Sequence, residues 1–162
     1  MVHSLFASTE DWDDQLEGFE GGWPGFFRVL RLYMSHFAGM KAAMALHMTS
    51  VEAPDLDVWR QLINGLGLAG ANVGEEWALH TPERLSSVVE HIEQNDRQRY
   101  VVLRLREPGP GIALLGTWGL GSSTNVITNL YLYGDDAEPR AASSELVWKT
   151  WCRETFASEN AR

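Results

Sequence analysis

The spacing of apolar residues changes along this chain from a helical period to a strand period. Over residues 76–134 apolar and polar side chains alternate in short runs, and turns rich in glycine, proline or asparagine separate them. The run at 99–107 is typical, because Val101, Leu103 and Leu105 share one side of the expected strand. Such a series predicts an antiparallel sheet that buries at least one face.

Amphipathic segments flank this region on both sides. Residues 17–39 have the helical period, residues 42–51 alternate as a strand, and a further helix begins near Pro54. Residues 140–157 close the chain as a helix with Trp148 on its apolar side. The order of helix, strand, helix, antiparallel strands and long helix predicts an α+β fold, in which the sheet covers its buried face with the last helix.

Composition limits the partners of such a fold. The formal net charge is -9, with 22 acidic against 13 basic residues. This balance argues against nucleic acid or an anionic membrane as the main partner. Cys152 is the single cysteine, so no intramolecular disulfide is expected and a reducing cytoplasm is the expected location. No apolar run reaches the roughly 20 residues that span a bilayer.

Two parts of the chain resemble a known superfamily. From about residue 42 to residue 156 the element order is similar to the helix-grip fold of START-like (SRPBCC) proteins, in which a curved antiparallel sheet wraps around a C-terminal helix. The opening stretch "FEGGWPGFFRVLRLYMSHF" resembles the closing helix of the subfamily related to activators of the heat-shock-protein-90 ATPase. The resemblance implies a START-like domain at 40–162, preceded at 1–39 by a helix that corresponds to the end of an earlier domain.

The opening helix then needs a surface of its own. The resemblance implies that the last helix fills the hollow side of the sheet, and an uncovered apolar stripe would mark an interface. We therefore expect the opening helix either to pack on the outer surface of the same chain or to mediate a homodimer. The residues expected at a dimer contact are Phe19, Trp23, Phe26 and Leu30.

The sequence offers no evident catalytic or metal-binding set. The histidines lack the spacing of metal ligands, and there is no CxxC motif. Glu90 and His91 are neighbours on an expected strand, where adjacent side chains point to opposite faces, so we do not expect an acid/base couple. Cys152 lies on the apolar side of the last helix and is interpreted as a small hydrophobe. We expect no catalytic residue, metal or cofactor.

Three function classes remain open. The first is a non-catalytic module that holds a small apolar molecule between the sheet and the last helix, as the superfamily often does. The others are a protein-interaction or co-chaperone-like domain, which the subfamily implies, and an enzyme of the cyclase or hydrolase kind. An ordinary solid core is the alternative to any cavity. The residues expected to line a ligand cavity are Met44, Met48, Trp59, His91, Trp118, Tyr131 and Trp148.

Overall fold

The sheet at the centre of the molecule has six antiparallel strands. The computed structural model describes residues 24–96 and 98–156. The strands are β1 (Ala43–Val51), β2 (Glu76–Leu79), β3 (Leu85–Gln94), β4 (Arg99–Glu107), β5 (Gly111–Leu120) and β6 (Ser123–Leu132), in the spatial order β1-β6-β5-β4-β3-β2. The first strand of the chain, β1, therefore lies at one edge of the sheet and pairs with the last strand, β6.

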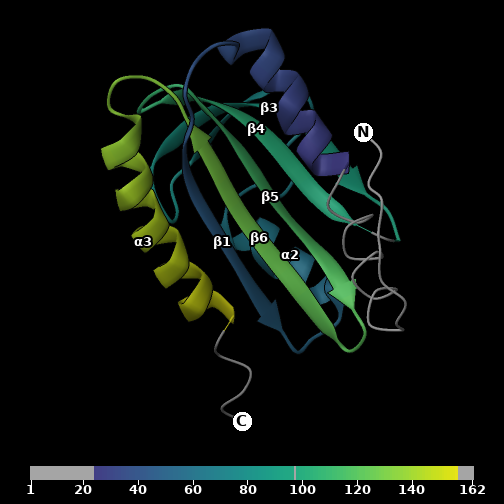
Figure 1. The fold of residues 1–162 in the computed structure, drawn as a ribbon. Coiled ribbons are helices and arrows are strands. Elements are labelled where there is room, and N and C mark those ends of the chain that lie inside the picture. Colours follow the sequence, from purple (N-terminus) through teal and green to yellow (C-terminus); the bar gives the residue numbers. More distant parts are fainter. Residues whose placement is uncertain (1–23, 97, 157–162) are drawn as a thin grey trace, which may run out of the picture.

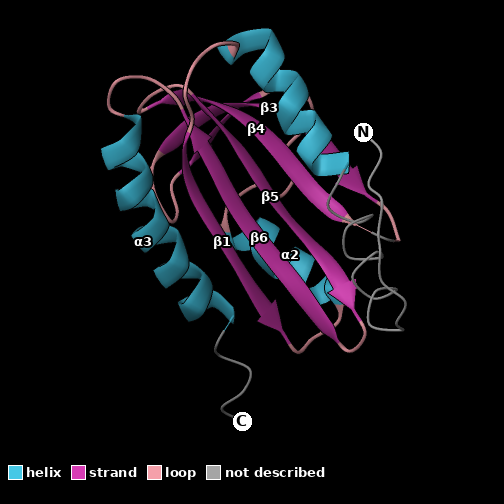
Figure 2. Ribbon diagram, viewed as in Figure 1, coloured by secondary structure: helices cyan, strands magenta, loops and turns pink. Residues whose placement is uncertain are grey.

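Helices lie on both faces of this sheet. Residues 24–32 are α-helical and continue into the π-helical turn η1 (Tyr33–Phe37), and residues 24–37 are called the leading helix below. The others are α2 (Asp55–Gly65) and α3 (Ala137–Phe156). The leading helix and α2 lie on opposite sides of the sheet, and α3 runs beside β1 (Figures 1 and 2). The α+β architecture predicted from the sequence, with an antiparallel sheet and a covering C-terminal helix, is confirmed.

Strand β4 contributes side chains to two hydrophobic cores, one on each face of the sheet. Val101, Leu103 and Leu105 belong to the core that contains α2 and α3, and this side of the sheet is called the inner face. Tyr100 and Val102 belong to the core beneath the leading helix, on the outer face. All five side chains are buried, so the strand is covered on both faces.

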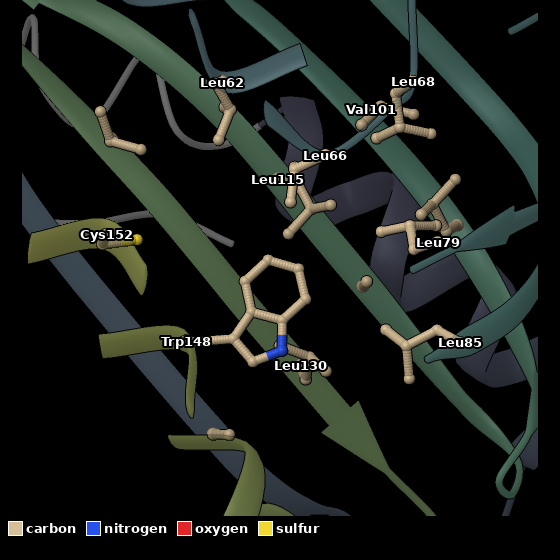
Figure 3. Close-up of a cluster of buried hydrophobic side chains, with 14 of the residues drawn as sticks. Leu62, Leu66, Leu68, Leu79, Leu85, Val101, Leu115, Leu130, Trp148 and Cys152 are labelled. Atoms are coloured by element: carbon tan, nitrogen blue, oxygen red, sulfur yellow. The ribbon is translucent and has the colours of Figure 1, made fainter. Parts of the chain in front are cut away.

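The inner core joins α3 to the sheet. Trp148 and Cys152 pack with Leu115 and Leu130 of the central strands, and α2 contributes Leu62 to the same core (Figure 3). The buried positions of α3 recur every three or four residues, which is the spacing that keeps one helical stripe against a surface. The predicted docking of the C-terminal helix on the sheet is therefore confirmed. The helix begins at residue 137, three residues before the predicted start.

Polar contacts fasten the helices over the inner core. The Trp148 indole donates a hydrogen bond to Glu83 Oε1 at 2.5 Å, and Ser144 Oγ donates to Glu83 Oε2 at 3.1 Å. Glu83 lies between β2 and β3, so it ties α3 to the far edge of the sheet. Asp55, in the first turn of α2, pairs with Arg99 of β4.

The leading helix packs on the outer face of its own chain. Phe37 stacks on Tyr133 with ring centroids 4.3 Å apart. At Gly25 the helix comes so close to β5 that an added Cβ would lie 3.1 Å from the Leu114 side chain. Val29 fills the space between these contacts and is 4% exposed. This is the first of the two arrangements expected for the opening helix. Phe19 and Trp23, which belong to the second, lie outside the described residues.

Candidate functional site

The seven residues expected to line one cavity lie on two faces of the sheet. Trp59 and Trp148 are part of the inner core. Met44 and Met48 point to the outer face, where they are 55% and 61% exposed, and Met44 is paired across the strands with Tyr131. Tyr131 packs against the outer core. The expectation of a single cavity wall formed by these residues is wrong.

The facing of β1 explains part of this error. Its side chains alternate as predicted, but Ala45 is the buried residue of the strand centre and Leu46 is exposed. Because α3 packs against the inner side of β1, small side chains on that side allow the helix to come close. The large methionine side chains are left on the outer side, where nothing among the described residues covers them.

His91 and Trp118 also lie on the outer side. His91 lines a groove together with residues of the leading helix. Trp118 lines a hollow of about 20 Å³ with Gly25 and Tyr100, which is space for about one water molecule.

The space between the sheet and α3 is filled with side chains. Trp148 is 1% exposed, Cys152, Leu115 and Leu130 are 0% exposed, and all four belong to one cluster. A cavity between the sheet and the C-terminal helix was the predicted location for a ligand, and around Trp148 and Cys152 packed side chains occupy that location. The large indole occupies the volume that a ligand would need.

Two larger hollows lie elsewhere. The first, called the inner pocket, has a volume of about 270 Å³ and lies between α2, the loop that follows it, and strands β3 and β4. Its apolar lining includes Trp59, Ile63, Leu68, Ile92 and Val101. Polar side chains of Arg60, Asn64 and Gln94 also line it. The pocket therefore combines an apolar floor with a few polar groups, as small-molecule sites do.

The second hollow, called the outer groove, has a volume of about 300 Å³ and lies between the leading helix and strands β3 and β4. Arg28, Arg31, Leu32, Ser35 and His36 form its helical wall, and Glu90, His91 and Val102 form the wall on the sheet.

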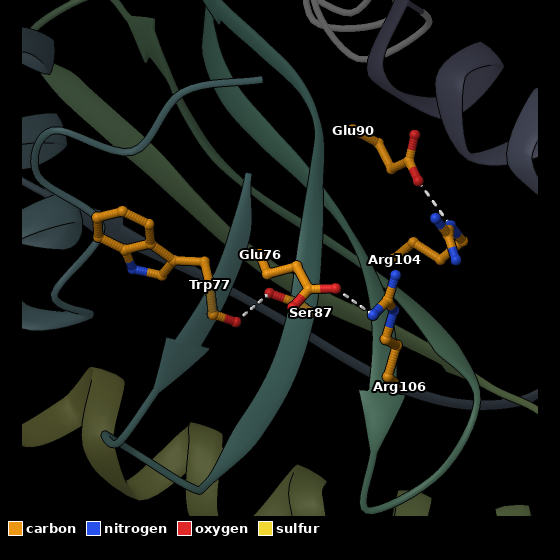
Figure 4. Close-up of polar contacts among 6 residues, drawn as sticks. All are labelled: Glu76, Trp77, Ser87, Glu90, Arg104 and Arg106. Atoms are coloured by element: carbon orange, nitrogen blue, oxygen red, sulfur yellow. Dashed lines mark hydrogen bonds and ion pairs between the residues drawn. The ribbon is translucent and has the colours of Figure 1, made fainter. Parts of the chain in front are cut away.

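Glu90 and His91 share the outer groove because of a β-bulge. The register between β3 and β4 shifts between Val89 and His91, so that Val89 is opposite Leu103 and His91 is opposite Val102. Glu90 is the extra residue, and its carboxylate accepts a hydrogen bond of 2.6 Å from Arg104 (Figure 4). The expectation that these neighbours point to opposite faces is wrong, because a bulge interrupts the alternation of the strand.

The electrostatic state of the groove follows from burial and from the arginines. Burial and the nearby Arg28 guanidinium lower the pKa of His91. His91 Nε2 is buried and lies 3.6 Å from Glu93 Oε2, which is too long for a hydrogen bond. Burial raises the pKa of the Tyr100 hydroxyl, and the nearby Arg28 guanidinium opposes this shift. At neutral pH the groove therefore contains a neutral imidazole between charged groups.

The residues that line the outer groove from the leading helix were not predicted as a site. Arg28, Arg31 and Ser35 fall on the side of the helix that an amphipathic pattern assigns to solvent. Their spacing of three and four residues does place them along one flank. That regular spacing was the available signal, but nothing in the sequence shows that the flank faces β3.

Cys152 has the environment of a structural cysteine. It is fully buried, and its Sγ lies 3.9 Å from Thr128 Oγ1. Burial raises the pKa of the thiol to about 11. A nucleophilic cysteine needs the opposite shift, so this position agrees with the interpretation of Cys152 as a small hydrophobe.

Among the described residues, no group of three or more histidine, cysteine, aspartate or glutamate side chains is arranged to hold a metal ion. In the same part of the chain, no helix combines the length and the apolar character needed to cross a membrane.

Comparisons with known proteins identify the fold. No family model matches the sequence, and no curated protein matches it significantly. Solved structures do match. Protein MLL2253 from Mesorhizobium loti superimposes with a TM-score of 0.56 at 11% identity, over 71% of this chain and 95% of that protein. CalU16 from Micromonospora echinospora has a TM-score of 0.52 at 11% identity, over 73% of this chain and 82% of CalU16.

A third match is DynU16, a protein of the dynemicin biosynthetic locus. It has a TM-score of 0.56 at 14% identity, over 73% of this chain and 47% of DynU16. Identities this low show a shared fold and nothing more specific. The chain has the helix-grip fold that START-like (SRPBCC) proteins share, as the element order predicted. Its relation to the activators of the heat-shock-protein-90 ATPase stays a prediction, since none of these comparisons tests it and residues 19–23 of the stretch that suggests it lie outside the described residues.

Proposed function

We propose that this protein binds a small, largely apolar molecule in the inner pocket. The observation that carries the proposal is the hollow of about 270 Å³ beside Trp59, which lies at the open end of the inner face where α3 does not fill the fold. Its volume is close to the lower end of the range for ligand sites, about 300–1,000 Å³. The ligand is therefore expected to be small.

The lining supports this ligand chemistry. Ile63 is the more exposed apolar side chain of the lining, and the largely buried Trp59, Leu68 and Val101 lie beside it. Arg60 and Asn64 can bond polar atoms at one end of the molecule. The origin of one fold neighbour, DynU16, in a biosynthetic locus is compatible with a small-molecule role. We infer binding without catalysis, because the pocket lining contains no acid and base that converge.

Native mass spectrometry of the full chain purified from its own host tests this proposal. We expect a retained molecule in the unaltered protein, and its loss in an Asn64→Trp variant, which places an indole at the lining of the pocket. Asn64 is exposed, so this change leaves the core intact. Leu56→Trp, at another exposed position of α2, is the matched control and should keep the molecule. Retention by the Asn64→Trp variant, or no molecule in any form, would contradict the proposal.

A second candidate function is self-association through the outer face. The leading helix exposes Phe26, Leu30 and Met34, and strand β1 exposes Met44, Leu46 and Met48 on the same face. A large exposed apolar surface often marks an interface. A second copy would present the same surface, so a two-fold contact would bury both at once. A protein-interaction role of the co-chaperone kind would use this surface too.

Sedimentation of the full chain tests the second candidate. We expect the mass of two chains at about 100 µM and of one chain in Leu46→Lys, because a charge inside an apolar contact is costly. Leu146→Lys is the control, since Leu146 is an exposed leucine of α3. If the unaltered protein has the mass of one chain, the self-association proposal is wrong, and the result does not affect the proposal for the inner pocket.

A further inference from the structure

The outer groove has the chemistry of an anion site. Its helical wall brings two guanidinium groups, Arg28 and Arg31, to face strand β3 across a space of about 300 Å³. Its apolar lining consists of the half-buried Leu32 and of Val102, which is fully buried. Neither arginine forms an ion pair with a described residue. The groove therefore offers two guanidinium groups that form no ion pair with a described carboxylate, in a protein whose net charge is -9.

The net charge of the residues at the groove indicates the charge of the ligand that would fit it. Arg104 is neutralised by Glu90, with which it shares a hydrogen bond of 2.6 Å. Glu93, whose Oε2 lies 3.6 Å from His91 Nε2, adds one negative charge near the two remaining guanidinium groups. His91 itself adds no charge at neutral pH, because burial lowers its pKa. About one positive charge remains, which matches a monoanion better than a dianion such as phosphate.

We propose that the outer groove binds a small organic monocarboxylate, with the carboxylate held by Arg28 and Arg31 and the apolar part lying against Leu32. Arginine suits this task because its planar fork donates two parallel hydrogen bonds to a carboxylate. The buried His91 Nε2, which has no hydrogen-bond partner among the described residues, supplies a third contact.

Binding and the protonation of His91 are coupled. The groups that face His91 are Arg28 and His36 from the leading helix, Glu90 and Glu93 from β3, and Tyr100 from β4. A bound carboxylate adds negative charge near the imidazole, which raises its pKa. By linkage, affinity rises as the pH falls toward the ordinary pKa of histidine. This site is separate from the inner pocket, which lies on the other face of the sheet.

Amide NMR titration of the full chain with hexanoate tests the proposal. We expect shifts concentrated in residues 28–36 and 90–102, and no comparable shifts with hexanol, which has the same chain without the charge. Hexyl phosphate should bind more weakly than hexanoate. An Arg31→Gln variant should bind hexanoate about tenfold more weakly, as expected for one lost charged hydrogen bond.

The matched control is Arg153→Gln, an exposed arginine in the last turn of α3 that lines neither the outer groove nor the inner pocket. It should leave the hexanoate affinity of the outer groove within about twofold of the unaltered value. Three results would overturn the proposal: no shifts in the groove, equal binding of hexanol or hexyl phosphate, or equal weakening by the two arginine variants. Because both arginines are exposed at the surface, neither variant is expected to unfold the chain.

Discussion

The contact between Trp148 and Glu83 allows a quantitative test of how α3 is held on the sheet. Trp148 is buried, and its indole donates a hydrogen bond of 2.5 Å to a carboxylate that lies between β2 and β3. A Trp148→Phe variant removes this donor and leaves one carboxylate oxygen without its protein partner. Hydrogen bonds to charged groups contribute about 1.5–3 kcal/mol, and the smaller ring adds a packing loss of about 1 kcal/mol. We expect the free energy of unfolding to fall by about 3 kcal/mol.

Urea denaturation followed by circular dichroism measures this change. For a slope of about 2 kcal/mol per molar urea, the midpoint should fall by about 1.5 M. Trp151→Phe is the matched control, because Trp151 lies one turn away, is half-buried, and packs its ring edge-on against Trp148. The control should lose about 1 kcal/mol, since it loses packing alone.

A double-mutant cycle decides between hydrogen bonding and packing. Glu83→Gln weakens the same contact from the other side, so its cost should be about 1 kcal/mol smaller in the Trp148→Phe background than in the unaltered protein. If Glu83→Gln has the same cost in both backgrounds, or if Trp148→Phe is no worse than Trp151→Phe, then the hydrogen bond does not hold the helix and the reasoning fails.

Three further predictions follow from other parts of the fold. The Cys152 thiol, with a pKa of about 11, should react with a disulfide reagent only as fast as the chain unfolds; rapid labelling in the absence of urea would show that the inner core is open. Gly116→Ala should destabilise by about 1–3 kcal/mol, because its Cβ would meet the Arg99 carbonyl oxygen at 2.7 Å, whereas Gly119→Ala on the same strand should be neutral in thermal melts. Burial lowers the pKa of His91 in the folded protein below its ordinary value of 6.5. At pH values between the folded-state and the unfolded-state pKa, the unfolded chain binds more protons, so stability rises with pH. His91→Gln should flatten this rise in urea titrations between about pH 5 and 7.5, and exposed His80→Gln should not.

The fold could be predicted from the sequence where the spacing of apolar residues fits only one kind of element. Alternation along 99–107 predicts two strand faces, and both exist. The three- and four-residue spacing in α3 predicts a buried stripe, and Trp148 and Cys152 lie in it. These patterns are reliable because each records which side chains leave water, and that does not depend on the identity of the covering element.

The facing of a strand is not predictable in the same way. In β1 the alternation separates Met44 and Met48 from Ala43 and Ala45, but it does not show which set is covered. Large apolar side chains are the usual choice for a core, and that preference led to the wrong face. The structure buries Ala45 because a helix must lie close to that side. The face that β1 buries therefore depends on how close α3 lies to the strand, and the sequence alone does not show that distance.

The bulge at Glu90 was hidden for a different reason. A single extra residue shifts the register of everything after it, and no glycine or proline marks the position. The placement of His91 beside Arg28 therefore required the structure. Strand periodicity alone therefore does not predict which face a residue next to a bulge points to.

The leading helix changes where this fold can bind a molecule. Trp148 fills the space between the sheet and α3, so the centre of the inner face is closed and only its open end beside Trp59 keeps a pocket. The helix on the outer face is held by Val29 and Phe37 on one stripe, and its arginine flank is thereby fixed above β3. A helix packed on a flat sheet must leave grooves along both flanks, because a cylinder touches a surface only along a line. The flank of the helix toward β3 is cationic, and another flank is apolar and exposes Leu30. If the cationic groove binds carboxylates and the apolar flank binds a second chain, one added helix has given the outer face two different surfaces without altering the inner core.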